Sequence, residues 1–107
     1  MKKEPRRIDY PDQEDYKAWV ILPAEWLGEH AVTREKIIAQ SEAFQHVELL
    51  NAAIALAVVD DYGGIPGFEG ADPEKWEPAK CPLRLLTWLT REVIEDFAEA
   101  YAVPKNS

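Results

Sequence analysis

The sequence predicts a mostly α-helical fold with one long central helix and one C-terminal helix. Between Thr33 and Tyr62 no Gly or Pro interrupts an apolar pattern with helical spacing. A second such pattern begins at Pro82 and runs to Tyr101. The chain has 107 residues, of which 47% are hydrophobic, and this suits one domain with a modest core. A short N-terminal extended segment and a short helix are expected to pack on the two long helices.

The central helix is expected to run from Thr33 to Gly64. Threonine caps helix N-termini by accepting a hydrogen bond from a free N–H, and glycines such as Gly63 and Gly64 readily adopt the left-handed conformation that ends a helix. The residues with helical spacing are Ile37, Phe44, Val47, Leu50, Ile54 and Val58. Ser41 is an alternative cap that would break the helix in two, and the sequence leaves both forms open.

The second half of this helix is apolar on every side. From Leu49 to Val59 only Asn51 is polar. A helix of this kind must be covered all round, either by other segments of the chain or by a second copy, so a homo-oligomer is possible. The run is too short for a membrane span, which needs about 20 apolar residues, and no membrane association is expected.

The N-terminal part divides into two regions. Residues 1–16 are polar and are expected to form a flexible arm, whereas residues 17–107 are expected to form a single helical domain. The arm holds a basic cluster (Lys2, Lys3, Arg6 and Arg7) that is either solvated or in contact with an acidic partner surface. Residues 17–22, KAWVIL, predict a short strand or extended segment. Pro23 then favours a short helix over residues 23–27, which Gly28 would end.

The C-terminal helix is expected to begin at Pro82 and to stop near Tyr101 or Ala102, because Val103 precedes a proline. Its acidic residues have the spacing i, i+3, i+4 and i+7 and form one strip. Two of them lie near the negative end of the helix dipole, where carboxylates are mildly unfavourable. This cost favours a docking surface, although a charge run is also typical of a solvated face. The predicted partner-binding residues are Trp76, Leu85, Trp88, Glu92, Glu95, Asp96 and Glu99.

Composition argues against several classes of function. The net charge of -8 disfavours a nucleic-acid partner, whose binding depends on neutralising phosphates. The single cysteine, Cys81, excludes an internal disulfide and suggests a reducing compartment. No apolar core follows the basic start, so no secretory signal is expected. No metal-ligand spacing, phosphate loop or nucleophile motif is present, so we expect no catalytic residue, metal, cofactor or enzymatic activity.

Two segments carry a family resemblance. VILPAEWLGEHAVTRE joins an apolar run to a Pro, a Trp, a Gly and a His, and KWEPAKCPLRLLTWLTREVIEDFAEAYAVPKN leads from a Trp through a Pro to a helix with an acidic face. Together they resemble the tail assembly chaperones of long-tailed bacteriophages, the short form made upstream of the tape measure protein. The resemblance extends from Lys17 to Asn106 and is a matter of spacing, since that family has no sharp signature.

The resemblance implies a non-enzymatic role. Such chaperones act in the host cytoplasm, where they keep the tape measure protein soluble and recruit tail tube subunits to it. They are absent from the mature virion. A frameshifted longer form is typical of them, and residues 103–105 permit a slippery codon run without establishing one. The charge also fits a different class, a small acidic inhibitory or adaptor protein that binds a basic host protein. A structural subunit of a particle is a third and weaker hypothesis.

Overall fold

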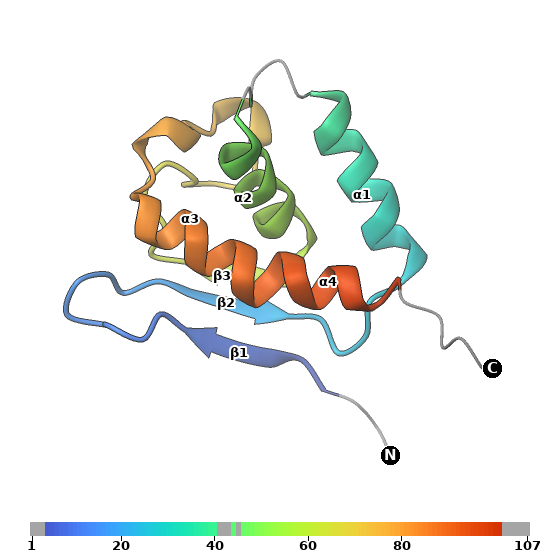
Figure 1. Cartoon of the computed structure of the whole chain (residues 1–107), viewed down its shortest axis with the longest axis horizontal. Helices are drawn as coiled ribbons and strands as arrows, with labels where there is room; N and C mark the ends of the chain where they lie inside the picture. Colours follow the sequence, from blue (N-terminus) through green and yellow to red (C-terminus); the bar gives the residue numbers. More distant parts are fainter. Residues whose placement is uncertain (1–3, 41–43, 45, 102–107) are drawn as a thin grey trace.

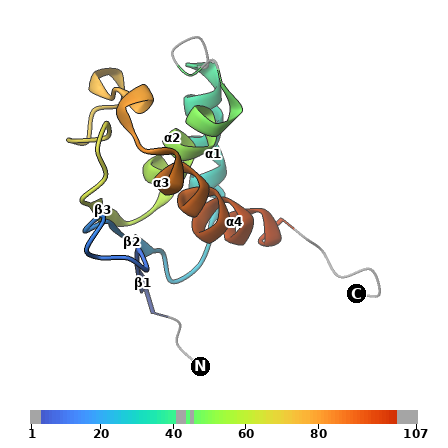
Figure 2. The ribbon, with the colours of Figure 1, turned by 60° about the vertical axis from the view of Figure 1, so that its left-hand side comes forward.

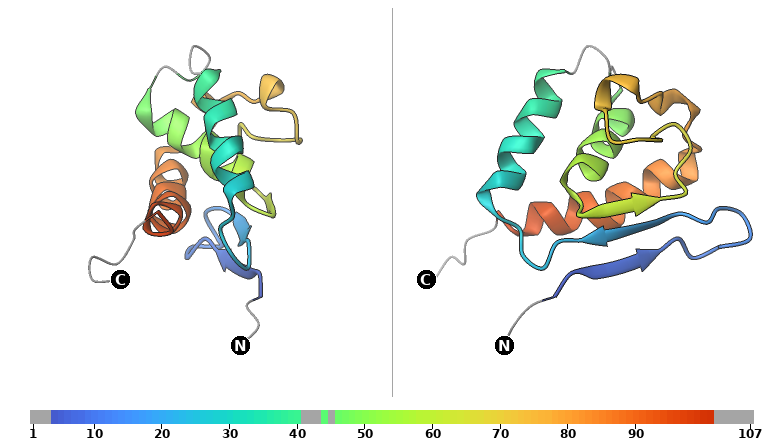
Figure 3. Two further views of the ribbon diagram at one scale, coloured as in Figure 1. Left: turned by 90° about the vertical axis from the view of Figure 1, so that its right-hand side faces the viewer. Right: turned by 180° about the vertical axis from the view of Figure 1, so that it is seen from behind.

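The chain folds into a mixed α/β domain in which the helices lie on one side of a small sheet (Figure 1; Figure 3, left). This computed structural model describes residues 4–40, 44 and 46–101. The sheet is antiparallel with the order β1-β2-β3 and consists of β1 (Arg6–Asp9), β2 (Trp19–Leu22) and β3 (Asp61–Gly63). The longer helices are α1 (Gly28–Ala39) and α2 (Val47–Val58). A continuous C-terminal helical run comprises α3 (Leu83–Leu89), the π-helical η4 (Thr90–Ile94) and α4 (Glu95–Glu99), and the loop before it holds the 3-10 turns η2 (Pro73–Lys75) and η3 (Pro78–Lys80).

The prediction of a mostly α-helical fold is therefore wrong, and the first reason is the segment before the double glycine. Helix α2 ends at Val58, and Val59 is already extended, with φ -71° and ψ 158°. The N–H of Asp60 donates to the carbonyl of Ile21 at 2.8 Å, and β3 follows. Two carboxylates at a helix C-terminus are unfavourable, and valine and tyrosine favour strands, so the chain leaves the helix here.

The prediction of one long central helix is also wrong, because two helices occupy this part of the chain. Helix α1 ends at Ala39, α2 begins at Val47, and His46 is extended. The predicted break point, Ser41, lies outside the described residues. The two helices pack against each other (Figure 2), so the first half of the expected helix covers the apolar second half. One straight helix could not provide that cover.

The expected short helix over residues 23–27 does not form, and α1 begins at Gly28 instead of Thr33. The first turn is closed by His30, whose Nδ1 accepts a hydrogen bond from the Leu27 N–H at 2.9 Å. This is half of a capping box. Thr33 lies inside the helix, where its hydroxyl donates to the carbonyl of Glu29 at 3.1 Å. It is not an N-cap.

The segment expected to be an arm contributes to the sheet from Arg6 onward. Strand β1 pairs with β2 in the register Arg6 to Leu22. A turn then returns the chain to β2, and in it the carboxylate of Asp12 accepts hydrogen bonds from the N–H groups of Glu14 and Asp15. The expected extended segment at residues 17–22 contains β2, which is buried at Val20 and Leu22 on the face toward the helices.

Candidate binding surface around Asp96

A groove separates β1 from the C-terminal helical run. One wall is β1, and the other carries all four carboxylates of the predicted acidic strip. The lining residues are Arg6, Arg7, Ile8, Asp9, Arg91, Glu92, Glu95, Asp96 and Glu99. The fold places them together because Arg6 of the edge strand β1 reaches Asp96 of α4, with 3.4 Å between Nη2 and Oδ1. The groove contains three arginines and five carboxylates, so its charge is net negative.

Asp96 joins three parts of the chain at this groove. Its Oδ2 accepts a hydrogen bond from the indole Nε1 of Trp26 at 2.8 Å, and its Oδ1 lies 3.4 Å from Nη2 of Arg6. The side chain of Arg6 is 62% exposed and that of Asp96 is 38% exposed. Ion pairs with this exposure contribute at most about 1 kcal/mol to stability. The contact therefore holds β1 near α4 without fixing it strongly.

The other three carboxylates of the strip make no such contact. Among the described residues, Glu92, Glu95 and Glu99 take part in no ion pair. The neighbouring Arg7 is used within β1, where its Nε lies 3.1 Å from Asp9. The strip thus presents charge that the described part of the chain does not neutralise.

The acidic strip lies beside a π-helical turn, η4. Within this run the hydroxyl of Thr90 donates to the carbonyl of Leu86 at 3.1 Å. Such turns are rare, and they occur often at functional positions. Here the turn keeps Val93 buried in the core while Glu92 and Glu95 remain toward the solvent side.

An apolar notch adjoins the groove at the end of α4. Its walls are the segment before α1, the first turns of α1 and the end of the C-terminal run. The lining residues are Trp26, Leu27, Gly28, Ala31, Phe97, Ala100 and Tyr101. The ring of Trp26 lies edge-on to Phe97 with 4.8 Å between centroids, and Phe97 lies 5.4 Å from Tyr101. Leu27 is 52% exposed and Tyr101 is 55% exposed.

Trp26 connects the notch to the groove. Its ring forms a wall of the notch, and its N–H binds the carboxylate of Asp96 in the groove. A shallow hollow that includes Arg6, Trp26, Asp96 and Ala100 lies between the two. We call the groove and the notch together the Asp96 surface. It combines apolar side chains with unneutralised carboxylates in one continuous area.

The structure separates the seven predicted partner-binding residues into two groups. Glu92, Glu95, Asp96 and Glu99 lie together in the groove. Trp76, Leu85 and Trp88 are buried, with exposed fractions of 8%, 0% and 2%. The indole of Trp76 donates to the carbonyl of Gly70 at 2.9 Å, and Trp88 packs edge-on against Tyr10. These three residues contribute to the core and the loop, and the Asp96 surface does not include them.

Sequence reasoning missed the other half of this surface. The sequence predicts that Arg6 lies in a flexible basic arm and that Trp26 lies in a short helix over residues 23–27. Both meet Asp96, which is 90 and 70 residues away in the chain. Leu27 belongs to no periodic pattern, and the apolar period that includes Tyr101 predicts a covered face, whereas Tyr101 is 55% exposed. Only the position of Trp26 between Pro23 and Gly28, outside a long apolar run, hinted that its ring could lie at the edge of the core.

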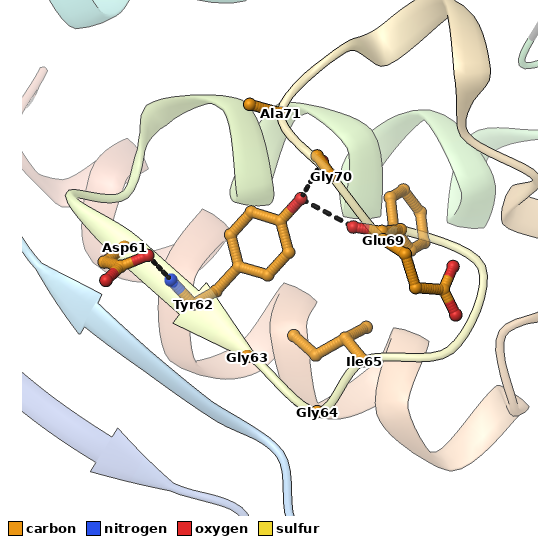
Figure 4. Close-up of a pocket in the computed structure, with 9 residues that line it drawn as sticks. Asp61, Tyr62, Gly63, Gly64, Ile65, Glu69, Gly70 and Ala71 are labelled. Carbon is orange, nitrogen blue, oxygen red and sulfur yellow. Dashed lines mark hydrogen bonds between the residues drawn. The ribbon is translucent and has the colours of Figure 1, made fainter.

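A second hollow lies over the glycine-rich loop, and its polar groups are already used (Figure 4). The hydroxyl of Tyr62 lies 2.6 Å from the carbonyl oxygen of Phe68 and 3.0 Å from that of Gly70. The N–H of Gly67 donates to the carboxylate of Glu69 at 3.1 Å. Burial raises the pKa of Tyr62, with smaller opposing and supporting effects from its neighbours. These bonds fix the loop and leave few groups for a ligand.

Several kinds of site find no support in the described residues. In that part of the chain no group of three or more His, Cys, Asp or Glu is placed to hold a metal ion. No helix there is long and apolar enough to cross a membrane. Cys81 is buried, and burial raises the pKa of its thiol to about 12.

No family model, curated protein or solved structure matches this chain.

Proposed function

We propose that this chain is a non-enzymatic tail assembly chaperone of a long-tailed bacteriophage, which binds the tape measure protein and helps to recruit tail tube subunits. The observation that supports this function is the Asp96 surface, where an apolar notch adjoins carboxylates that the described residues do not neutralise. The sequence resemblance from Lys17 to Asn106 points to the same class. The protein would act in the host cytoplasm and would be absent from the finished virion.

The surface fits an amphipathic helical partner. An apolar side chain of the partner would enter the notch beside Leu27 and Tyr101, both of which are more than half exposed. Lysine or arginine residues on the next turns would then face Glu92, Glu95 and Glu99 in the groove. Helix-in-groove binding uses this division, in which apolar anchors supply affinity and charges supply orientation. The net charge of -8 would keep the complex soluble.

The test is co-expression with the protein encoded immediately downstream, with the soluble fraction of that protein as the readout. Leu27→Asp is the informative variant, because it puts a charge into the notch while aspartate remains a good residue for the N-cap of α1. Val32→Asp is the matched control, since Val32 is 55% exposed and lies outside the notch. Loss of one buried leucine contact should weaken binding about tenfold or more.

Two results would contradict this function. The downstream protein would be equally soluble with and without the chaperone, or Leu27→Asp and Val32→Asp would behave alike. An acidic adaptor for a basic host protein predicts a different result. Its binding would fall steeply between low and high salt, because exposed charges are screened, and it would be insensitive to Leu27→Asp.

A further inference from the structure

Strand β1 has one open edge. It pairs with β2 on one side, and in the order β1-β2-β3 no strand of the described chain pairs with its other side. The views in Figure 1 and Figure 3 agree that no helix covers this edge. An open edge offers unpaired N–H and C=O groups to another strand. Natural proteins protect such edges with short strands, charged side chains or proline. Strand β1 is short and charged, but its charges have both signs (Arg6, Arg7 and Asp9).

The register shows which backbone groups face outward. The N–H of Tyr10 donates to the carbonyl of Ala18 at 2.9 Å, and Ile8 and Arg6 pair with Val20 and Leu22. In an antiparallel ladder, hydrogen-bonded and non-hydrogen-bonded pairs alternate. Residues 6, 8 and 10 therefore bond to β2, and the backbone groups of Arg7 and Asp9 face the open edge.

The side chains of these two residues are complementary to a second copy of the same strand. Arg7 and Asp9 have opposite charges, share the outer face of the sheet, and are 55% and 52% exposed. Within one copy they pair with each other at 3.1 Å, and the dimer would exchange this pair for two pairs between the copies. A two-fold axis at Ile8 would place Arg7 opposite Asp9 of the other copy, twice, and Ile8 opposite Ile8. In this register the outward backbone groups of both strands also meet as hydrogen-bonded pairs. Backbone and charge thus select the same alignment.

We propose that two copies of this chain associate through β1, antiparallel and centred on Ile8, to form one continuous six-stranded sheet. A two-fold interface of this kind is self-complementary. An interface this short buries less area than stable dimers do, so the association is weak and depends on concentration. The axis is perpendicular to the sheet, and both helical layers lie on the same side. The two Asp96 grooves then face each other across the paired β1 strands.

The test measures mass against concentration by sedimentation or light scattering. As the protein concentration increases, the average mass of the wild type should rise from 12.2 kDa, the mass of one chain, toward twice that value. Arg7→Asp places two aspartates opposite each other, and Asp9→Arg places two arginines opposite each other. Each should weaken self-association about tenfold or more, since like charges in cross-strand pairs are destabilising. An equimolar mixture of the two variants restores both opposite-charge pairs and should regain the wild-type dimer.

Controls separate this interface from general charge repulsion and from misfolding. Arg34→Asp on α1 changes the net charge by the same amount as Arg7→Asp and should leave self-association unchanged. Amide exchange of the wild type needs no substitution. The N–H groups of Arg7 and Asp9 should become protected as concentration rises, whereas that of Ile8 is protected throughout.

Three results would overturn the proposal: a wild type that stays at the mass of one chain up to about 1 mM, a mixture that fails to dimerise, or amide protection that does not change. These measurements contain no tape measure protein, so a failure of the dimer would leave binding at the notch standing.

Discussion

The glycine-rich loop after β3 and the Asp96 surface both place acidic residues beside aromatic rings, yet they differ in what those residues contact. In the loop, Tyr62 and Trp76 bind backbone carbonyls, and Glu69 binds a backbone N–H. On the Asp96 surface Asp96 binds Arg6 and Trp26 and Asp9 binds Arg7, whereas Glu92, Glu95 and Glu99 are in no ion pair of the described residues. The first arrangement determines the local fold, and the second leaves charge for a partner.

The difference separates two uses of polar residues in a small domain. Buried polar groups that bind backbone rigidify a segment, because leaving them unpaired is costly. Exposed carboxylates contribute little to stability, and carboxylates without a partner in the fold can form ion pairs with another protein. Substitutions in the loop should therefore lower stability, and substitutions in the groove should alter binding instead.

Gly64→Ala should give the largest effect. Gly64 has φ +68°, and a Cβ there would lie 2.1 Å from the carbonyl oxygen of Lys17. The left-handed conformation alone costs a side chain about 1–2 kcal/mol, and the clash forces the backbone to move, so we expect a loss of at least about 3 kcal/mol. Urea unfolding measures it. Gly70→Ala is the control, since Gly70 has φ +80° but an open surround, and it should cost only about 1 kcal/mol.

Tyr62→Phe should come next. It keeps the ring and removes the hydroxyl that bonds to Phe68 and Gly70. The carbonyl of Gly70 retains the Trp76 indole, so the loss should be about 1–2 kcal/mol. Urea unfolding at neutral pH measures it, and amide exchange of residues 67–71 should become faster. An unchanged free energy of unfolding would mean that the hydroxyl does not hold this loop.

Cys81 should make stability fall at alkaline pH. Burial, and secondly Glu69, raises the pKa of its thiol from 9.0 to about 12. The unfolded chain releases this proton first, so the contribution is complete below about pH 9 and is lost as pH rises toward 12. The wild type should lose about 1.4 kcal/mol more than Cys81→Ala between pH 8 and pH 10. Parallel unfolding curves for the two proteins at both pH values would contradict the burial of the thiol.

The C-terminal helix was predictable because its signals are local. Pro82 starts it and the apolar period continues to Phe97, so the structure has a helical run from 83 to 99. The sheet was not predictable in the same way. Strands β1 and β3 have four and three residues, too few for an alternating pattern. Residues 61–63 have some local preference for a strand, but the strand forms through pairing with β2, which is distant in the sequence.

The acidic half of the Asp96 surface was visible in the sequence, and the rest was not. Helical spacing alone places Glu92, Glu95, Asp96 and Glu99 on one strip. The contacts of Asp96 with Arg6 and Trp26 depend on how distant segments come together. The same limit applies to Leu85 and Trp88, whose spacing predicted an apolar face. Which part of that face stays exposed depends on the elements that cover it. In this structure Leu85 and Trp88 are both covered.

The smallest effect on stability, and the sharpest contrast with the loop, is expected from the triple variant Glu92→Gln, Glu95→Gln and Glu99→Gln. Its free energy of unfolding should stay within about 0.5 kcal/mol of the wild type, because the three carboxylates pair with no cation of the described chain. Binding of a basic helical partner should weaken and lose its salt dependence. Glu29→Gln, Glu35→Gln and Glu48→Gln on α1 and α2 change the net charge equally and should leave binding unaltered. If both triple variants weaken binding alike, only the overall charge attracts the partner, and the groove contributes no specific contact.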